Sequence, residues 1–419
     1  MAATERPSGS PPAAPSPRRS SRRKPRRRGA GALGKLPVLA AGLGALAARK
    51  AQGQSSIDAR FLFYKESDGR TQVMNPWLGI HQELGPTLGN LDLLLAYDSI
   101  SGASPTGAFP SLDVTTSASG NVVASGSFPT AEYSDKRTFA SLAWSKKLGA
   151  HLPSVDLSYG KENDYEARSF GLSDSWTLLG GRGTLHAGFS YSSDLVEPVT
   201  NDLSLSKRSA GYALGWTWVL GERDLLDVSG SWTSLSGYLD DPYKVVPVGP
   251  DGSTQTLPDR RPDSRSRLAL VARYGHSFGS RSALKLTYRY YRDDWQVSAH
   301  TLEAAYDQRL FGKWVVTPEV RLYTQSAASF YGARFPVEQP YMSSDYRLSS
   351  LWNALGGLTV GREIDDRFGI RLGGTYQYQK GRDRITLSGT GEAGEEGTAA
   401  VSAADMKVFT VTLGFTFKY

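Results

Sequence analysis

The sequence lacks cysteine altogether and has only five histidines among its 419 residues. Without thiols the chain forms no disulfide or thiolate metal site, and it has no c-type haem attachment or cysteine nucleophile. The histidines show no metal-ligand spacing, so we expect no metal site and no cofactor. After residue 55 there is also no run of about eighteen apolar residues, so we expect no membrane-spanning helix there.

Glycine and aromatic residues are abundant instead. There are 45 glycines, 21 tyrosines and 9 tryptophans. This composition is typical of a β-rich chain with aromatic girdles. The net charge of +7 is concentrated in residues 1–53, which hold twelve Lys or Arg and one acid. That segment carries +11, so residues 54–419 carry −4, and the body of the protein is slightly acidic.

Residues 1–54 resemble an export signal. Arg18–Arg28 form a basic region, and Ala30–Ala48 form an apolar stretch that ends near Ala45-Leu46-Ala47, an A-x-A-like cleavage site. The basic run also fits a nucleic-acid-binding tail. Because export explains the same residues, we predict a signal segment over residues 1–54, a barrel over 55–419, and no nucleic-acid partner.

The last residues alternate strictly between apolar and polar. Phe409, Val411, Leu413, Phe415, Phe417 and Tyr419 occupy the odd positions. A period of two places all of them on one face of a strand. A transmembrane β-barrel needs such a closing strand, apolar toward lipid and polar toward the lumen. Phe415, Phe417 and Tyr419 are the residues we expect the barrel assembly machinery to recognise.

Sixteen segments with this period predict an all-β fold: a transmembrane antiparallel β-barrel of about 16 strands, with short periplasmic turns and long outer loops. We find no repeat of the kind that a β-propeller needs, and the predicted strands are longer than those of a β-sandwich. The long connections are 101–135, 194–206, 239–262, 327–345 and 382–404, and we expect the large outer loops, especially 101–135, to fold in and narrow the pore. The predicted strands are 56–66, 70–84, 88–100, 136–147, 152–162, 166–179, 183–193, 207–220, 223–238, 263–279, 281–293, 296–310, 313–326, 346–362, 365–381 and 405–419.

Alternation also assigns charged side chains to the lumen, which sixteen strands leave wide enough for water. The first strand contributes Asp58, Arg60, Tyr64 and Glu66. The candidates for selectivity are Arg265, Arg267, Arg273, Lys285, Arg289, Glu319, Arg321, Arg367 and Arg371. This arginine-rich arc would attract anionic solutes, or it would form ion pairs that rigidify the wall.

The outer rim holds the candidates for other chemistry. Asp293, Asp294 and His300 are residue types that outer-membrane hydrolases use, but alternation places His300 on the lipid side, away from a common substrate atom. Asp345 and Arg347, at the start of a predicted strand, would form a constriction, a ligand site or mouth-stabilising pairs. The GxGxxG match at Gly389–Gly394 lies in a polar loop that lacks the strand and helix of a nucleotide site.

Several rim segments resemble a bacterial family catalogued as domain of unknown function 3570. The resemblance covers about residues 56–419 and implies an outer-membrane barrel, but it assigns no catalytic residue. The segments are Asp68–Arg70, Ile100–Gly107, Asp240–Lys244, Arg289–Trp295, Ser298–Thr301, Tyr323–Ala328 and Ser343–Ser349.

The function we expect is a porin-like channel or solute-binding pore in the Gram-negative outer membrane, reached by export through the inner membrane. Its partners would be outer-membrane lipids and lipopolysaccharide, the barrel assembly machinery and small solutes. The alternatives are a scaffold that holds a periplasmic or surface partner, such as a redox protein, and, with less support, a rim hydrolase. We do not expect an enzyme.

Overall fold

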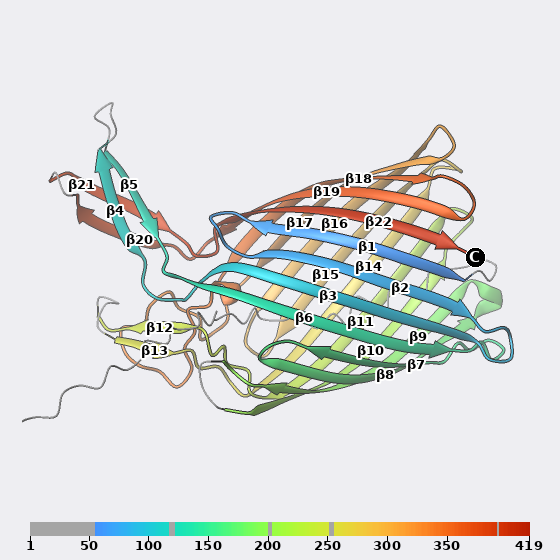
Figure 1. The fold of residues 1–419 in the computed structure, drawn as a ribbon, viewed down its shortest axis with the longest axis horizontal. Coiled ribbons are helices and arrows are strands. Elements are labelled where there is room, and N and C mark those ends of the chain that lie inside the picture. Colours follow the sequence, from blue (N-terminus) through green and yellow to red (C-terminus); the bar gives the residue numbers. More distant parts are fainter. Residues whose placement is uncertain (1–54, 117–121, 200–202, 251–254, 392–393) are drawn as a thin grey trace, which may run out of the picture.

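The computed structural model describes residues 55–116, 122–199, 203–250, 255–391 and 394–419. Sixteen antiparallel strands close into one barrel (Figure 1). All sixteen predicted strands are present, and the predicted fold class is confirmed. The predicted signal lies outside the described residues.

The barrel strands follow one another around the wall in chain order. Among the described residues, the helical structure consists of two 3-10 turns, η1 (Leu179–Gly181) and η2 (Tyr346–Leu348), and no helix is long and apolar enough to cross a membrane. The barrel strands are β1 (Ser56–Glu66), β2 (Gln72–Glu83), β3 (Asn90–Pro105), β6 (Thr130–Ser145), β7 (Ser154–Lys161), β8 (Tyr165–Leu178), β9 (Gly183–Val196), β10 (Leu205–Val219), β11 (Asp224–Gly237), β14 (Ser264–Ser277), β15 (Ser282–Asp293), β16 (Ser298–Leu310), β17 (Trp314–Gln325), β18 (Leu351–Glu363), β19 (Phe368–Gly381) and β22 (Met406–Lys418).

The long connections contain structure that the sequence pattern did not predict. Three hairpins lie within them: β4 (Ser111–Thr116) with β5 (Val122–Ser127), β12 (Val245–Val248) with β13 (Gln255–Pro258), and β20 (Ile385–Thr390) with β21 (Glu396–Val401). The first and last hairpins project together beyond the barrel (Figure 1). The expectation that 101–135 folds into the pore was therefore wrong, because most of that segment extends β3 and β6 or forms β4–β5.

The registers separate two faces of the wall. On β22, β19 and β1, Phe415 pairs with Ile370 and with Ala59, whereas Gly414 pairs with Arg371 and with Arg60. Directly paired residues lie on the same face of a sheet. The first row is apolar and points outward, and the second carries charge into the lumen. Large exposed hydrophobic residues such as Leu172, Leu214, Leu302 and Leu372 continue the apolar face around the barrel.

The two ends of the barrel differ. One end has only short turns between successive strands, and its outward positions carry Trp144, Trp176, Trp218 and Trp314, each 37–41% exposed. Such an aromatic girdle is typical of the edge of an apolar membrane zone. The other end carries the long connections and both projecting hairpins (Figure 1).

β1 and β22 form the seam of the barrel. They pair over eleven residues, from Ser56 with Lys418 to Glu66 with Val408. The backbone N–H of Tyr419 also donates to the carbonyl of Ser55 at 2.9 Å. The last strand thus closes the barrel with its aromatic face outward, as its alternation predicts.

Candidate functional site

Two long connections fold into the mouth of the barrel at the long-loop end. We call their described residues, 238–250, 255–263 and 326–350, the mouth plug. Tyr346 of the plug packs in one cluster with Tyr64 of β1, Tyr323 of β17, and Met406 and Val408 of β22. By register, these wall residues belong to the lumen face. Tyr346 therefore lies in the barrel lumen, against the inner face of the wall.

The two plug segments are joined by backbone hydrogen bonds. The N–H of Phe335 donates to the carbonyl of Pro247 at 3.0 Å, and the N–H of Arg260 donates to the carbonyl of Met342 at the same distance. Val246 and Met342, both without exposed surface, pack between the segments. The plug is therefore a folded unit with its own small core.

Asp345 is the centre of a buried charge network in the plug. Its side chain is 1% exposed. The Arg347 Nε donates to both carboxylate oxygens at 2.8 Å, and the Arg261 Nη2 donates at 3.0 Å. Arg347 also contacts Asp241, and the Nε of Arg261 donates to Asp259 at 2.6 Å. Three carboxylates and two guanidiniums thus hold the segments together, as buried charges require.

The plug contacts the barrel wall on two opposite sides. The Nζ of Lys244 donates to the Ser104 hydroxyl of β3 at 2.8 Å and also to the carbonyl of Pro105. The hydroxyl of Tyr243 donates to Asp164, between β7 and β8, at 2.6 Å. On the other side, Gln325 of β17 donates to the carbonyl of Ser349 at 2.7 Å. Because β17 and β7 are eight positions apart in the ring of sixteen, these contacts tie opposite walls across the mouth.

Electrostatics in the plug follow from burial and pairing. Burial alone would raise the pKa of Asp345, but Arg347 and Arg261 outweigh it and hold that pKa well below its ordinary value. Burial raises the pKa of Asp259, although Arg261 opposes this. Burial lowers the pKa of Lys244, which Asp345 partly offsets. The network is therefore in place with Asp345 ionised at neutral pH.

Asp345 and Arg347, predicted to begin a strand, instead lie in the plug around η2. β18 begins at Leu351, because Asp345 caps the turn by accepting from the N–H of Arg347. Of the three alternatives for this pair, the contacts match mouth stabilisation. Its partners Asp241 and Arg261 were missed by the sequence analysis, since a structureless loop gives no periodicity from which to pair them.

The three candidate hydrolase residues do not converge. Asp293 points inward, where it accepts from the Arg265 Nε at 2.9 Å and from the Tyr291 hydroxyl at 2.7 Å. Asp294 is exposed and accepts a hydrogen bond from the backbone N–H of Ser266 at 2.9 Å. His300 lies on the outward face, bonded to the Tyr288 hydroxyl at 2.8 Å. Alternation along β15 and β16 thus separates Asp293 from His300.

Most of the predicted lumen charges are present on the inner face, and many are paired. Arg273 pairs with Asp227 at 2.8 Å, Lys285 with Asp307, and Arg321 with Glu303 at 4.0 Å, while Arg265 holds Asp293. The buried Nε of Arg267 has no hydrogen-bond partner among the described residues. Glu319 lies over Gly357, and the Arg289 guanidinium, which has no hydrogen bond or ion pair among the described residues, lies 6.0 Å from the centre of the Tyr291 ring. The arc thus combines wall-stiffening pairs with open charges.

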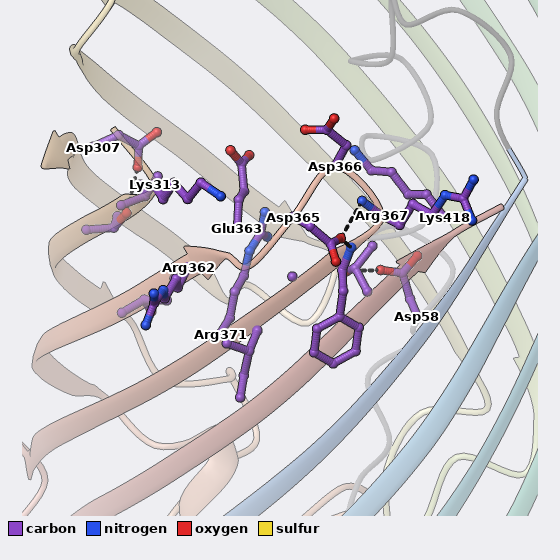
Figure 2. Close-up of a pocket in the computed structure, with 18 of the residues that line it drawn as sticks. Asp58, Asp307, Lys313, Arg362, Glu363, Asp365, Asp366, Arg367, Arg371 and Lys418 are labelled. Atoms are coloured by element: carbon purple, nitrogen blue, oxygen red, sulfur yellow. Dashed lines mark hydrogen bonds between the residues drawn. The ribbon is translucent and has the colours of Figure 1, made fainter. Parts of the chain in front are cut away.

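The opposite end of the lumen holds a cavity of about 660 Å³, which we call the inner vestibule (Figure 2). Strands β15–β19, β22 and β1 line it, together with the short turns that join them. Its cationic lining residues are Arg60, Lys285, Lys313, Arg362, Arg367, Arg371 and Lys418; its anionic ones are Asp58, Asp307, Glu363, Asp365 and Asp366. Cations therefore outnumber anions. In the turn, the N–H groups of Arg367 and Phe368 donate to Asp365 and lower its pKa.

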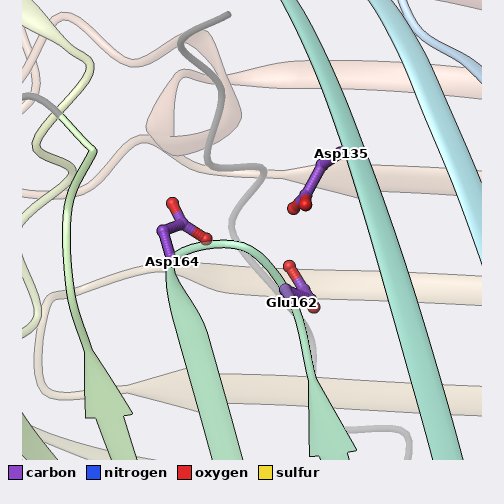
Figure 3. A group of neighbouring side chains, drawn as sticks. All are labelled: Asp135, Glu162 and Asp164. Carbon is purple, nitrogen blue, oxygen red and sulfur yellow. The ribbon is translucent and has the colours of Figure 1, made fainter. Parts of the chain in front are cut away.

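A group of three carboxylates supports the plug from the β6–β8 side. The oxygens of Asp135, Glu162 and Asp164 lie within 4.8 Å of one another, and all three residues are buried (Figure 3). Protein groups contact each of them: the N–H of Asn163 donates to Asp135 at 3.3 Å, Arg137 lies 4.0 Å from Glu162, and Tyr243 binds Asp164. The sequence analysis did not single out this group, because Asp135 lies on β6 while Glu162 and Asp164 lie in the turn between β7 and β8.

The sequence matches one protein family. The model of the family described as "Protein of unknown function (DUF3570)" matches residues 34–210 and 203–403. No sequence among the curated proteins matches the chain.

Among the solved structures of similar shape are a secretin, a siderophore receptor and OpdK. A bacterial polysaccharide outer membrane secretin aligns with a TM-score of 0.48 at 9% identity, over 88% of this chain and 100% of its own. The siderophore receptor PirA from Acinetobacter baumannii gives 0.43 at 9%, over 87% of this chain and 60% of the receptor. OpdK of Pseudomonas aeruginosa, solved with vanillate, gives 0.41 at 8%, over 87% and 98%. This chain thus spans less than two thirds of the receptor. Because these scores lie below 0.5, the fold rests on the strand ladders themselves.

Proposed function

The chain belongs to the family described as protein of unknown function DUF3570, and from its own geometry we propose that it is an outer-membrane pore for small solutes. In this proposal solutes diffuse through the barrel, and the mouth plug closes the outer end. The residues that set selectivity are the open charges of the lumen. A sixteen-stranded wall is wide enough for an aqueous channel.

The observation that carries the proposal is the inner vestibule. It is a charged cavity of about 660 Å³ inside a barrel whose outward face is apolar. A barrel that served only as a wall in the membrane would not need exposed, unpaired arginines within its lumen. Arg289 and Arg371 are two such residues, since neither guanidinium has a hydrogen bond or ion pair among the described residues.

The proposal places the long loops outside the cell. Just beyond the apolar band at the loop end, exposed cations face outward on β1, β6, β7, β10, β15 and β22. They are Lys65, Lys136, Lys161, Arg208, Arg292 and Lys407. Anionic lipid headgroups attract such a belt, and the phosphates of lipopolysaccharide supply that charge in the outer leaflet. The short turns and Tyr419 then face the periplasm, where the barrel assembly machinery would meet Phe415 and Phe417.

A second candidate is a scaffold that holds a surface partner. The projecting hairpins β4–β5 and β20–β21 favour it, because they pack on each other beyond the barrel and take no part in its wall (Figure 1). A plug that never opens would also suit a scaffold better than a pore.

Planar-bilayer recording separates the two functions. The detergent-folded protein is compared with a variant in which residues 328–346 are replaced by a short Gly/Ser linker. A pore is expected to give ion steps that become larger and longer in the plug-deleted barrel. A folded, heat-modifiable barrel that stays silent after the deletion would contradict the pore and leave the scaffold.

A further inference from the structure

We propose that Arg60 and Arg371 form a binding subsite for small oxyanions, carboxylates or phosphates, on the seam wall of the inner vestibule. The inference rests on the proposed pore and deepens it by naming the class of solute and the residues that recognise it.

The register places the two arginines on either side of a glycine. Arg60 of β1 and Arg371 of β19 both pair with Gly414 of β22. A Cβ at Gly414 would lie 3.6 Å from the Cγ of Arg60 and 3.9 Å from the Cβ of Arg371. Neighbouring strands lie about 4.8 Å apart, so the two arginine backbones are separated by roughly 10 Å. Glycine leaves the floor between the two side chains open.

Both side chains have packed stems and free guanidiniums. The Arg60 guanidinium carbon lies 4.7 Å from the centre of the Trp77 ring, a cation–π contact that holds the group without using its N–H donors. The stem of Arg371 lies over Gly361, with its Cγ 3.3 Å from the place a Cβ would occupy. Both residues are exposed in the cavity, and among the described residues neither guanidinium has a hydrogen bond or ion pair.

No carboxylate among the described residues forms an ion pair with either guanidinium. Asp58 accepts from the Thr416 hydroxyl at 2.6 Å and from Ser56 at 3.5 Å. Asp307 is paired with Lys285, and Asp365 accepts the N–H groups of its own turn. The seam wall therefore offers two unused, planar donor forks to whatever enters the vestibule.

The chemistry of the fork defines the ligand. Guanidinium presents parallel N–H donors that match the two oxygens of a carboxylate or phosphate, and these charge-assisted pairs are among the stronger hydrogen bonds. A neutral sugar or a cation gains nothing from such a pair. The positive excess of the vestibule lining adds a general attraction for anions.

The test measures binding and conduction separately. Succinate and inorganic phosphate are titrated into the detergent-folded full chain by calorimetry, and the reversal potential is recorded in a salt gradient. Arg60→Gln and Arg371→Gln are each expected to weaken the binding of at least one anion about tenfold or more and to reduce anion preference. Arg223→Gln is the matched control, because it removes the same charge at the same barrel end from an exposed turn between β10 and β11 that does not line the vestibule.

The outcomes distinguish the subsite from the pore. Binding that is lost in both lumen variants but kept in the control supports the subsite, even if the protein conducts no ions and the pore fails. Conduction without anion binding, or binding unchanged in both variants, overturns the subsite and leaves the pore. Arg60→Lys separates bidentate recognition from charge alone. This variant is expected to keep the charge and the reversal potential but to lose bidentate binding of the anion. Heat-modifiability confirms that each variant is folded, and the relative strength of succinate and phosphate identifies the preferred oxyanion.

Discussion

Replacing Asp345 by asparagine removes the central charge of the mouth plug while keeping its size. Asp345 is 1% exposed and accepts from both Arg347 and Arg261. In the variant, two largely buried guanidiniums lose the buried counter-ion that they share. Removing one partner of a buried ion pair costs about 3–5 kcal/mol.

The surroundings place the expected cost at the lower end of that range. Arg347 keeps Asp241, Arg261 keeps Asp259, and the Arg347 side chain is 21% exposed. We therefore expect a loss of about 3 kcal/mol. At about 1.4 kcal/mol for each factor of ten, the equilibrium between closed and open plug shifts roughly a hundredfold toward the open state.

Two measurements follow that shift. Amide hydrogen exchange across residues 326–350 is expected to accelerate by up to the same factor, and open-channel time in planar bilayers is expected to rise. Glu338→Gln is the matched control in the same loop, because its ion pair with Arg260 is exposed, at 57% and 38% of the two side chains, and such pairs contribute about 1 kcal/mol or less. If Asp345→Asn and Glu338→Gln exchange at the same rate, the network does not hold the plug closed.

Three further predictions concern the plug and the seam. Gly107→Ala should loosen the plug, because Gly107 has φ +91° and an added Cβ would lie 2.3 Å from the carbonyl oxygen of Val245. The rate of protease cleavage within residues 238–263 measures the loosening. An unchanged cleavage rate would contradict the prediction. Lowering the pH from 7.5 to 5.0 should not open the plug. The pKa of Asp345 in the folded plug lies below its unfolded value near 3.9, so Asp345 contributes its full stabilisation at every pH above 3.9. That stabilisation is lost only as the pH falls through the folded pKa. The raised pKa of Asp259 acts in the opposite sense and favours the folded plug on acidification, so larger conductance at pH 5.0 would refute this reasoning. Deleting Phe417–Tyr419 should abolish barrel assembly and leave export intact, since the deletion removes the outward aromatic end of β22 and the hydrogen bond from Tyr419 to Ser55. A heat-modifiable barrel in the outer membrane after the deletion would show that the seam does not need these three residues.

The wall of the barrel was predictable from the sequence because its determinants are local. Alternation along 365–381 or 405–419 depends only on neighbouring positions, and closing the barrel adds no new pattern. The predicted faces of Arg371, Glu319 and His300 follow from the same rule. The ends of strands were less accurate: β3 continues to Pro105 and β6 begins at Thr130, because their pairing extends beyond the apolar band.

The plug was not predictable in the same way. Asp241, Arg261 and Asp345 lie about 20 and 84 residues apart along the chain, and nothing in their spacing shows that they meet. Each also lies in a polar loop, where a charged residue is expected at the surface. Only the folding of both loops into one mouth makes the three residues a buried unit. The same holds for Arg60 and Arg371, which become neighbours only when the seam closes.

The central claim is that the plug closes the outer mouth of a solute pore, and the absence of native cysteine allows a direct test. Ala213→Cys places one thiol on the lumen face of β10, opposite Gly188 and Ser231. A membrane-impermeant maleimide is added to intact cells that carry this variant, with and without Asp345→Asn. We predict slow labelling with the plug intact and roughly hundredfold faster labelling with Asp345→Asn. Fast labelling in both, or no labelling even after the plug is released, would contradict the account.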